Sequence, residues 1–262
     1  MMRQISLPIK GKWVGHYCEW YSLIDSTNVR ACQMAKEKIP AGAVVWARQQ
    51  ESGKGRRGGV WFDSPDESLL FSLLIYPEFS FEIAPLFGVL VSTAVSKGIW
   101  SSTGVYTQIK WPNDLYSQGK KVCGILNQAQ IRGNQWESFV IGVGLNINNR
   151  TFPENLDQNA TSLGQISGKV YDVQNVLIYI LQEIEQLYQR CLESSVQELR
   201  QEYESQMLWK GQTIQVIEKT NIFSATLLGI SERANARVKL ENGIEKELNS
   251  GEVSIRGNEV CR

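Results

Sequence analysis

The sequence predicts an α+β protein in which a mixed or antiparallel sheet with helices is followed by a small β-barrel. Two patterns predict this fold. Between residues 173 and 191 the apolar residues recur at steps of three and four, which is the period of an amphipathic helix. From about Trp209 the chain changes to short alternating segments separated by turn residues, which is typical of a small closed barrel. We therefore expect one domain over residues 1–208 and a second over residues 209–262.

Strands and helices alternate irregularly along the first domain. Strands are expected at 17–24, 43–48, 68–76, 106–111, 121–131 and 136–148. The triplet Arg132-Gly133-Asn134 has the residue types of a tight turn, so the last two strands should form a hairpin. Helices are expected over 29–38, after the N-cap residue types at 25–28, and over 81–100. The charged segment 193–204 predicts one or two exposed helices.

The second domain is expected to contain strands and tight turns. Its strands are expected at 213–217, 223–230, 237–240 and 253–255. The dipeptide Asn242-Gly243 is a strong turn signal among them. Strands of this length, without helices, would bury their apolar faces by closing into a barrel.

The charge balance excludes a broad surface for nucleic acid or for an anionic membrane. The 262 residues include 27 basic and 27 acidic side chains, which leaves a net charge of zero. The longest apolar run, at 84–95, has about a dozen residues, whereas a bilayer span needs about 20, so this run predicts a buried helix. The first residues lack the apolar core of a secretory signal.

The cysteines and the single histidine limit the chemistry. The five cysteines are widely spaced, without a C-x-x-C pair, which favours a reducing cytoplasm over a disulfide framework or a zinc site. With His16 as the only histidine, a Ser-His-Asp triad and a multi-histidine metal centre are both disfavoured. We therefore expect catalysis to depend on lysine, arginine, aspartate and asparagine.

A basic glycine-rich loop is the first candidate for ligand binding. Residues 53–59 read GKGRRGG, and four glycines in seven positions let backbone N–H groups approach a ligand closely. Residues 48–57 contain four cations and one anion, for a local charge of +3. The spacing fits neither a P-loop nor a dinucleotide-binding turn. Taken alone, the loop is equally compatible with phosphate binding and with a solvated basic segment or a weak RNA contact.

Two further motifs follow, and each has an ordinary structural interpretation. The segment 110–116 reads KWPNDLY and is followed by GKKVCGIL at 119–126. Because Pro-Asn-Asp is common turn chemistry, these residues alone favour a simple β-hairpin. The segment 140–148 reads VIGVGLNIN, and its two glycines favour a core strand packed closely against another backbone.

Together and in this order, the motifs resemble those of the biotin–protein ligases, also called biotin–acetyl-CoA-carboxylase synthetases. The matching segments are Ser26-Thr27-Asn28, the GKGRRGGVW loop, KWPNDL, KVCGIL from Lys121, and GVGLN from Gly142. The resemblance is dense over 17–148, weakens in the helical region and returns at 250–255. It implies the class II synthetase-like fold of the biotin/lipoate ligase catalytic domain, followed by an SH3-like barrel.

The resemblance implies an ATP-dependent ligase whose ligands are biotin, ATP and Mg²⁺. Biotin would be activated as biotinyl-5′-AMP and then transferred to a lysine of a biotin carboxyl carrier protein, a subunit of acetyl-CoA carboxylase. Because two anions must meet in the first step, fixed cations and backbone N–H groups are the expected catalysts. Magnesium would accompany the ATP phosphates, with Asp114 as its candidate ligand.

The resemblance also implies the residues of the site. Biotin would contact Ser26, Thr27, Asn28, Gln50, Gly53, Lys54, Gly55, Arg56, Lys121 and Gly124. ATP and the adenylate would contact Lys54, Arg56, Arg57, Trp61, Asn113, Lys121 and Asn146. The catalytic residues would be Lys121, Arg56 and Asp114, with Asp114 orienting the acceptor lysine or the metal.

Two features depart from the family pattern. Lys54 stands where the family usually has arginine, so a bidentate contact is not expected there. About 16 residues precede the first expected strand, too few for the winged helix-turn-helix of the family's repressors, so we expect a monofunctional ligase that binds no DNA. A strand near 136–147, if it lies at an edge of the sheet, would pair across a homodimer.

Two alternative functions remain at this point. A lipoate–protein ligase shares the fold class and the adenylate chemistry, but its loops lack GKGRRGG and KWPNDL. A non-catalytic nucleic-acid-binding protein would use the basic loop and the C-terminal barrel instead. For each function we expect a cytoplasmic protein without a membrane partner.

Overall fold

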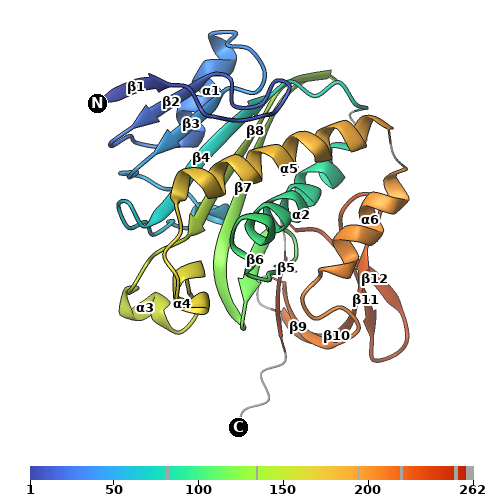
Figure 1. Ribbon diagram of the computed structural model, residues 1–262. Helices are drawn as coiled ribbons and strands as arrows, with labels where there is room; N and C mark the ends of the chain where they lie inside the picture. Colours follow the sequence, from blue (N-terminus) through green and yellow to red (C-terminus); the bar gives the residue numbers. More distant parts are fainter. Residues whose placement is uncertain (81–82, 134, 194, 219–220, 251–252, 258–262) are drawn as a thin grey trace.

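The computed structural model describes residues 1–80, 83–133, 135–193, 195–218, 221–250 and 253–257. Its strands form one sheet of eight strands and one of five. Figure 1 shows helices α2 and α5 crossing the front of the larger sheet, with the smaller sheet below them. The expected α+β class, with a sheet separate from the main body near the C-terminus, is confirmed.

The larger sheet is mixed. Its strands are β1 (Met2–Ile5), β2 (Cys18–Tyr21), β3 (Val44–Ala47), β4 (Ser68–Ile75), β5 (Gln108–Lys110), β6 (Asp114–Ser117), β7 (Lys120–Arg132) and β8 (Gln135–Asn146). They lie in the order β1-β2-β3-β4-β8-β7-β6-β5. β2 and β3 pair in parallel, and every other neighbouring pair is antiparallel. The strands β1 and β6 were not expected from the sequence.

The interior position of β8 corrects one prediction. β8 pairs with β7 along the expected hairpin and also with β4, from Ser68 opposite Asn146 to Ile75 opposite Phe139. It is therefore not an edge strand, and the proposed pairing of residues 136–147 across a homodimer is wrong. The hairpin itself is confirmed, with Gly133 at a positive φ of 60°, while Asn134 lies outside the described residues.

Helices cover both faces of this sheet. The longer helices are α1 (Thr27–Lys36), α2 (Ala84–Thr103), α5 (Val173–Glu193) and α6 (Val196–Ser205), and the short ones are α3 (Glu154–Asp157), α4 (Leu163–Ser167) and the 3₁₀ turn η1 (Arg56–Gly58). α2 and α5 approach closely, because a Cβ on Gly98 would lie 2.6 Å from the Cα of Ile180. The apolar stripe predicted for α5 is buried as expected.

Alternation along the strands assigns α1 to the opposite face. Val44 and Leu73 belong to the main core beneath α2 and α5, whereas Val45 and Leu74 pack with Met34 of α1 in a second cluster. α1 begins at Thr27 with Ser26 as its N-cap, two residues before the predicted start. The side chains of residues 26–28 are therefore buried at the first turn of the helix.

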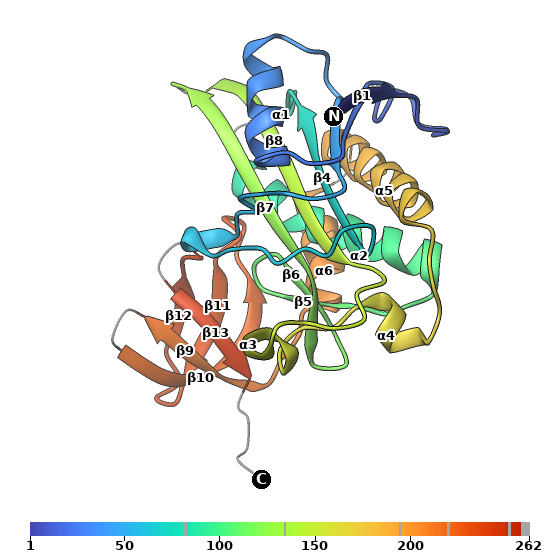
Figure 2. The same ribbon diagram turned by 90° about the vertical axis from the view of Figure 1, so that its left-hand side faces the viewer.

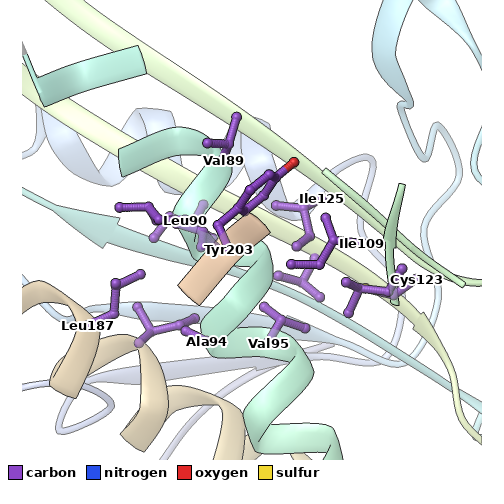
Figure 3. Packing of buried hydrophobic residues seen from close by; sticks show 14 of the residues in the cluster. Val89, Leu90, Ala94, Val95, Ile109, Cys123, Ile125, Leu187 and Tyr203 are labelled. Atoms are coloured by element: carbon purple, nitrogen blue, oxygen red, sulfur yellow. The ribbon is translucent and has the colours of Figure 1, made fainter. Parts of the chain in front are cut away.

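The helix expected within 193–204 forms as α6, but it is exposed on one side only. α6 buries Leu199 and Tyr203 on one side, four residues apart. Figure 3 shows Tyr203 within the apolar cluster. Tyr203 is fully buried, and its hydroxyl donates a hydrogen bond to the carbonyl oxygen of Pro112 at 2.9 Å. Pro112 follows a cis peptide bond at Trp111. α6 therefore supports the KWPNDL turn from below.

The smaller sheet contains β9 (Thr213–Glu218), β10 (Asn221–Ile230), β11 (Ala236–Leu240), β12 (Glu245–Leu248) and β13 (Val253–Gly257), in the order β12-β11-β10-β9-β13. Four of these strands match the prediction, and β12 was not expected. No ladder joins β12 to β13 among the described residues, so the expected closure into a barrel is not confirmed. The sheet contacts the main body where the indole of Trp111 donates to the Ala234 carbonyl at 2.9 Å.

Two further expectations concern the chain as a whole. Among the described residues, no helix combines the length and the apolar character needed to cross a membrane. The described cysteines, Cys18, Cys32, Cys123 and Cys191, are all free thiols, and Cys261 lies outside the described residues.

Candidate active site

A cavity of about 380 Å³ lies on the α1 face of the larger sheet. Its walls are the first turn of α1, the basic loop, the KWPNDL turn, the strands β7 and β8, and β13 of the smaller sheet. Figure 2 views this side of the molecule and shows the basic loop passing in front of β7 and β8, with the smaller sheet beside it. Motifs that lie more than 100 residues apart in the sequence thus meet at one place.

Glycines form the floor of the cavity. The indole of Trp61 lies against Gly124 of β7 and Gly144 of β8, where an added Cβ would come within 2.9 and 2.5 Å of its ring atoms. A Cβ on Gly142 would collide with the side-chain amide of Asn28. The glycines of β8 therefore make room for side chains, which corrects the interpretation that they pack against another backbone. Trp61 Nε1 is buried without a hydrogen-bond partner.

Neutral polar groups form one end of the cavity. The backbone N–H and the hydroxyl of Thr27 donate to Gln50 Oε1 at 2.8 and 3.1 Å. Ser72 donates to Thr27 Oγ1 at 2.8 Å and to Asn28 Oδ1 at 2.6 Å. Ser26 completes this end of the lining. The sequence prediction that these hydroxyl and amide groups gather at one site is consistent with this arrangement.

The rest of the described lining is strongly cationic. It contains the cations Lys54, Arg56, Lys110, Lys121 and Arg256 and one carboxylate, Asp114. Lys121 Nζ lies 2.8 Å from the Asp114 carboxylate and 5.6 Å from the centre of the Trp61 ring system. Such an excess of positive charge in a concave site fits an anionic ligand.

One of these cations, Arg256, was missed by the sequence analysis, whereas Lys110 was expected near the anionic site as part of the KWPNDL motif. Lys110 donates to the Tyr116 hydroxyl at 3.2 Å, and burial lowers the pKa of its ammonium, although Asp114 opposes that shift. Arg256 comes from β13. The KWPNDL motif contained the signal for Lys110, but no local pattern relates Arg256 to the cavity.

The basic loop is folded on itself. Gly55 N–H donates to the Gly59 carbonyl at 2.6 Å, and Gly59 N–H donates to the Arg56 carbonyl at 3.0 Å. These two N–H groups therefore already donate hydrogen bonds within the loop. A phosphate could accept from them only after these internal hydrogen bonds had broken. The side chain of Arg57 lies outside the described part of the loop.

Arg56 and Asn113 join the loop to the turn and to the smaller sheet. Arg56 donates to the Ser250 carbonyl at 2.6 Å and to Asn113 Oδ1 at 3.3 Å. The Asn113 amide in turn donates to the carbonyl of Ile125. Asn113 is buried and does not line the cavity, so in this structure it braces the turn against β7.

Two more predicted residues lie outside the cavity lining. Gly53 is buried, and its carbonyl accepts the Trp61 N–H at 2.9 Å, so it supports the loop. Asn146 is buried at the end of β8 and donates to the Thr161 carbonyl at 3.1 Å, while its Oδ1 has no partner. Its predicted contact with adenine stays a prediction.

The donor set does not fit a resident magnesium ion. The described residues contain no group of three or more histidine, cysteine, aspartate or glutamate side chains that could hold a metal. Asp114, the carboxylate in the described lining, is already paired with Lys121. Mg²⁺ prefers several oxygen ligands, so it would depend here on phosphate oxygens of a bound ATP.

Comparison with known proteins assigns this fold and cavity to a class. The sequence model of the biotin/lipoate A/B protein ligase family matches residues 20–146, which carry most of the cavity lining. A biotin protein ligase from Aquifex aeolicus, solved in complex with biotin and ATP, is 30% identical, with a TM-score of 0.78 over 92% of this chain and 98% of that one.

Curated relatives narrow the class. The bifunctional ligase/repressor BirA of Bacillus spizizenii is 31% identical over 245 residues, which cover 93% of this chain and 75% of the relative. A biotin–[acetyl-CoA-carboxylase] ligase of Paracoccus denitrificans is 31% identical over 125 residues, which cover 47% of this chain and 51% of the relative. The chain belongs to the biotin–protein ligase family.

Proposed function

We propose that this chain joins biotin to a lysine of a biotin carboxyl carrier protein at the expense of ATP. In the first step a carboxylate oxygen of biotin bonds to the α-phosphorus of ATP, and pyrophosphate leaves with the bridging oxygen. In the second step the lysine nitrogen bonds to the carbonyl carbon of biotinyl-5′-AMP. The bond between that carbon and the phosphate oxygen breaks, and AMP leaves with the oxygen. The two protons that the lysine ammonium loses pass to solvent.

The observation that carries this proposal is the cationic cavity on a glycine floor with a neutral polar end. A carboxylate and a phosphate held about 4 Å apart repel each other by about 4 kcal/mol at an effective dielectric constant of 20. Five cations against one carboxylate offset that repulsion and the charge that develops on the α-phosphate. A neutral ligand would gain little from such a lining.

The neutral end suits the ureido ring of biotin. A ureido group offers one carbonyl acceptor and two N–H donors, and hydroxyl and amide side chains can meet both kinds of group. Ser26, Thr27 and Gln50 would make these contacts, with Asn28 beneath them. Gly124 would lie beside the apolar part of biotin.

The cations of the cavity would bind the biotin carboxylate and the ATP phosphates. Lys121 would contact both the biotin carboxylate and the α-phosphate, after leaving Asp114. The basic loop would close over the phosphates through Lys54, Gly55, Arg56 and Arg57, with Gly53 supporting its backbone. Loop closure would also protect the hydrolysable adenylate from water.

Adenine would lie between Trp61 and Asn146. The buried Asn146 Oδ1 has no hydrogen-bond partner, and a buried acceptor without a donor is costly. This atom therefore suits the amino group of a base. Asn113 would act by holding the turn that carries Asp114, and Asp114 would orient the incoming lysine. Mg²⁺ would enter as MgATP, and its presence stays a prediction.

Several further expectations belong to this proposal. We divide the chain into a ligase domain, 1–208, and a C-terminal domain, 209–262, whose five-stranded sheet would close into an SH3-like barrel. The relative named for acetyl-CoA carboxylase supports a carboxyl carrier protein as the partner. A cytoplasmic setting, a homodimer by some surface other than β8, and the absence of DNA binding stay predictions.

The substrate is tested by comparing biotin with lipoate in separate incubations. The purified chain is incubated with MgATP, a biotin carboxyl carrier domain or a lipoyl domain, and either acid, and the carrier mass is measured. We expect addition of one biotinyl group to the carboxyl carrier domain and none with lipoate. Labelling by lipoate alone would establish the lipoate–protein ligase alternative. Absence of labelling together with salt-dependent RNA binding would favour the nucleic-acid-binding alternative.

A further inference from the structure

Trp209 has an unusual backbone conformation at the junction between the two sheets. Its φ of 66° lies in the left-handed region, which a bulky side chain adopts only at a cost in free energy. Strain of this kind persists where the surrounding structure holds the residue in place, and it often marks a residue with a functional role. The backbone on each side of Trp209 supplies that restraint.

The chain before Trp209 is bonded to the larger sheet, and the chain after it is bonded to the smaller one. Leu208 N–H donates to the carbonyl of Ile109 in β5 at 2.8 Å. Gly211 N–H donates to the carbonyl of Leu227 in β10 at 2.7 Å. Trp209 therefore turns the chain from one sheet to the other and is fixed at both sides.

The indole of Trp209 touches two segments that border the main cavity. Lys110 Nζ lies 5.5 Å from the centre of the Trp209 ring and 5.1 Å from the centre of the Tyr116 ring. On β13, a Cβ added to Gly257 would come within 2.8 Å of the indole. Lys110 lines the cavity, whereas Trp209 does not. Any effect of Trp209 on a ligand in the cavity must therefore pass through its neighbours.

The ammonium of Lys110 lies in an unfavourable electrostatic position. Burial lowers its pKa, and the cations Lys121 and Arg256 act in the same direction, whereas Asp114 opposes them. The Asp114 carboxylate is already paired with Lys121 at 2.8 Å. Short-range attraction comes from the Tyr116 hydroxyl, which accepts a hydrogen bond from Lys110 at 3.2 Å, and from the two aromatic rings.

We infer that Trp209 is a positioning residue, which holds the ammonium of Lys110 in the cavity wall to bind the ATP phosphates. This rests on the proposed function, in which the cations of the cavity bind those phosphates. A charge that is fixed before the substrate arrives needs no reorganisation during the reaction, so it stabilises the transition state more effectively. The strained backbone of Trp209 is retained because it places the indole beside this ammonium.

A double-mutant cycle tests this inference, with biotin-dependent exchange between ATP and pyrophosphate as the assay. The variant W209L keeps apolar bulk and removes the ring, whereas W209F keeps a ring. Each is made in the unaltered chain and in K110M, which removes the charge. W100L is the control, because Trp100 is 56% exposed on α2 and does not line the cavity. The melting temperature of every variant is also measured.

We expect W209L to lower kcat/KM for ATP by roughly 3- to 30-fold, which is the range for one cation–π contact, with the KM for biotin within about twofold of the unaltered value. W209F should retain more of the activity than W209L. In K110M, W209L should cause no further loss beyond about twofold, because the charge on which the ring acts is already absent. W100L should exchange pyrophosphate at the unaltered rate.

The variant G257A gives a second test if W209L does not fold. Its added methyl group presses on the indole from β13 and leaves the side chains of Trp209 and Lys110 unaltered. We expect G257A to lower kcat/KM for ATP in the unaltered chain and to have no further effect in K110M. If K110M exchanges too slowly to be measured, the comparison of the two KM values in W209L decides the matter.

The possible outcomes separate this inference from the proposed function. A loss of equal size in the unaltered chain and in K110M would show that Trp209 does not act through Lys110. Exchange at the unaltered rate by W209L or by K110M would also overturn the inference and would leave biotin activation intact. An equal rise in the KM for ATP and for biotin would make Trp209 a structural residue only. Absence of biotin-dependent exchange in the unaltered protein would contradict the proposed function itself.

Discussion

Replacement of Lys121 by methionine should separate catalysis from folding. The side chains of Lys121 and Asp114 are 31% and 29% exposed, and an ion pair in such a position contributes about 1 kcal/mol or less to the free energy of unfolding. Methionine keeps the length of the stem, so the packing over Trp61 is largely retained. The melting temperature of K121M should therefore stay within a few degrees of that of the unaltered protein.

The expected loss in adenylation is far larger. In the proposed mechanism Lys121 contacts the carboxylate and the α-phosphate as charge develops on the phosphorus. Loss of one such preorganised donor costs about 3–4 kcal/mol of transition-state stabilisation, which corresponds to a rate lower by roughly 100- to 1,000-fold. The assay is biotin-dependent ATP–pyrophosphate exchange, measured at saturating MgATP.

The neighbouring lysine provides the control. Lys120 precedes Lys121 on β7 but does not line the cavity, so K120M should exchange pyrophosphate at nearly the unaltered rate. If K121M exchanged within about threefold of the unaltered protein, Lys121 would not be a catalytic residue. If K121M lost activity only because its melting temperature collapsed, the 2.8 Å ion pair with Asp114 would be structural and the reasoning from exposure would be wrong.

Three further predictions follow from contacts around the site. Gly142→Ala should displace the Asn28 amide, lower the free energy of unfolding by about 2–3 kcal/mol and raise the KM for biotin, measured by denaturant titration and pyrophosphate exchange. Tyr203→Phe should cost about 1 kcal/mol, because a buried hydrogen bond to the KWPNDL turn is lost, and should lower kcat more than it raises KM. The hydrogen bond from Arg30 lowers the pKa of the buried Glu19 carboxyl, so this pair stabilises the fold at pH values above the ordinary glutamate pKa of 4.5. The stabilisation is lost as the pH falls through the lowered pKa. Glu19→Gln should remove this part of the acid dependence of the free energy of unfolding.

Each of these predictions has a contradicting result. An unchanged biotin KM in Gly142→Ala would mean that Asn28 does not hold the neutral end of the cavity in place. A Tyr203→Phe variant with unaltered kcat would separate α6 from the position of the turn. If the unaltered protein and Glu19→Gln lost stability in parallel between pH 6 and pH 3, the carboxyl would not be stabilised in its charged form.

The main features of the fold could be predicted because they have local causes. The α5 stripe follows a period of 3.6 residues, and Gly133 marks a hairpin between two apolar strands. The residues of the cavity could be predicted only from the motifs taken together. Pro-Asn-Asp and the β8 glycines each have an ordinary structural interpretation, and only their shared order suggested one site.

The errors arise where partners are distant in the sequence or a pattern is masked by charge. β8 became interior because β4 pairs with it across more than 60 residues, a contact that no local pattern shows. β12 has the sequence EKEL, whose charged residues hide its alternation, and the buried Tyr203 lies within a charged segment. Arg256 reaches the cavity only because β13 of the smaller sheet forms part of the cavity wall.

The central claim is that this cavity activates biotin by joining it to AMP. The most direct test is mass spectrometry of the chain incubated with biotin and MgATP, without any carrier protein. We predict that biotinyl-5′-AMP is detected in the presence of both substrates and disappears when either is omitted. Absence of the adenylate with biotin, or formation of an adenylate only with lipoate, would contradict the claim.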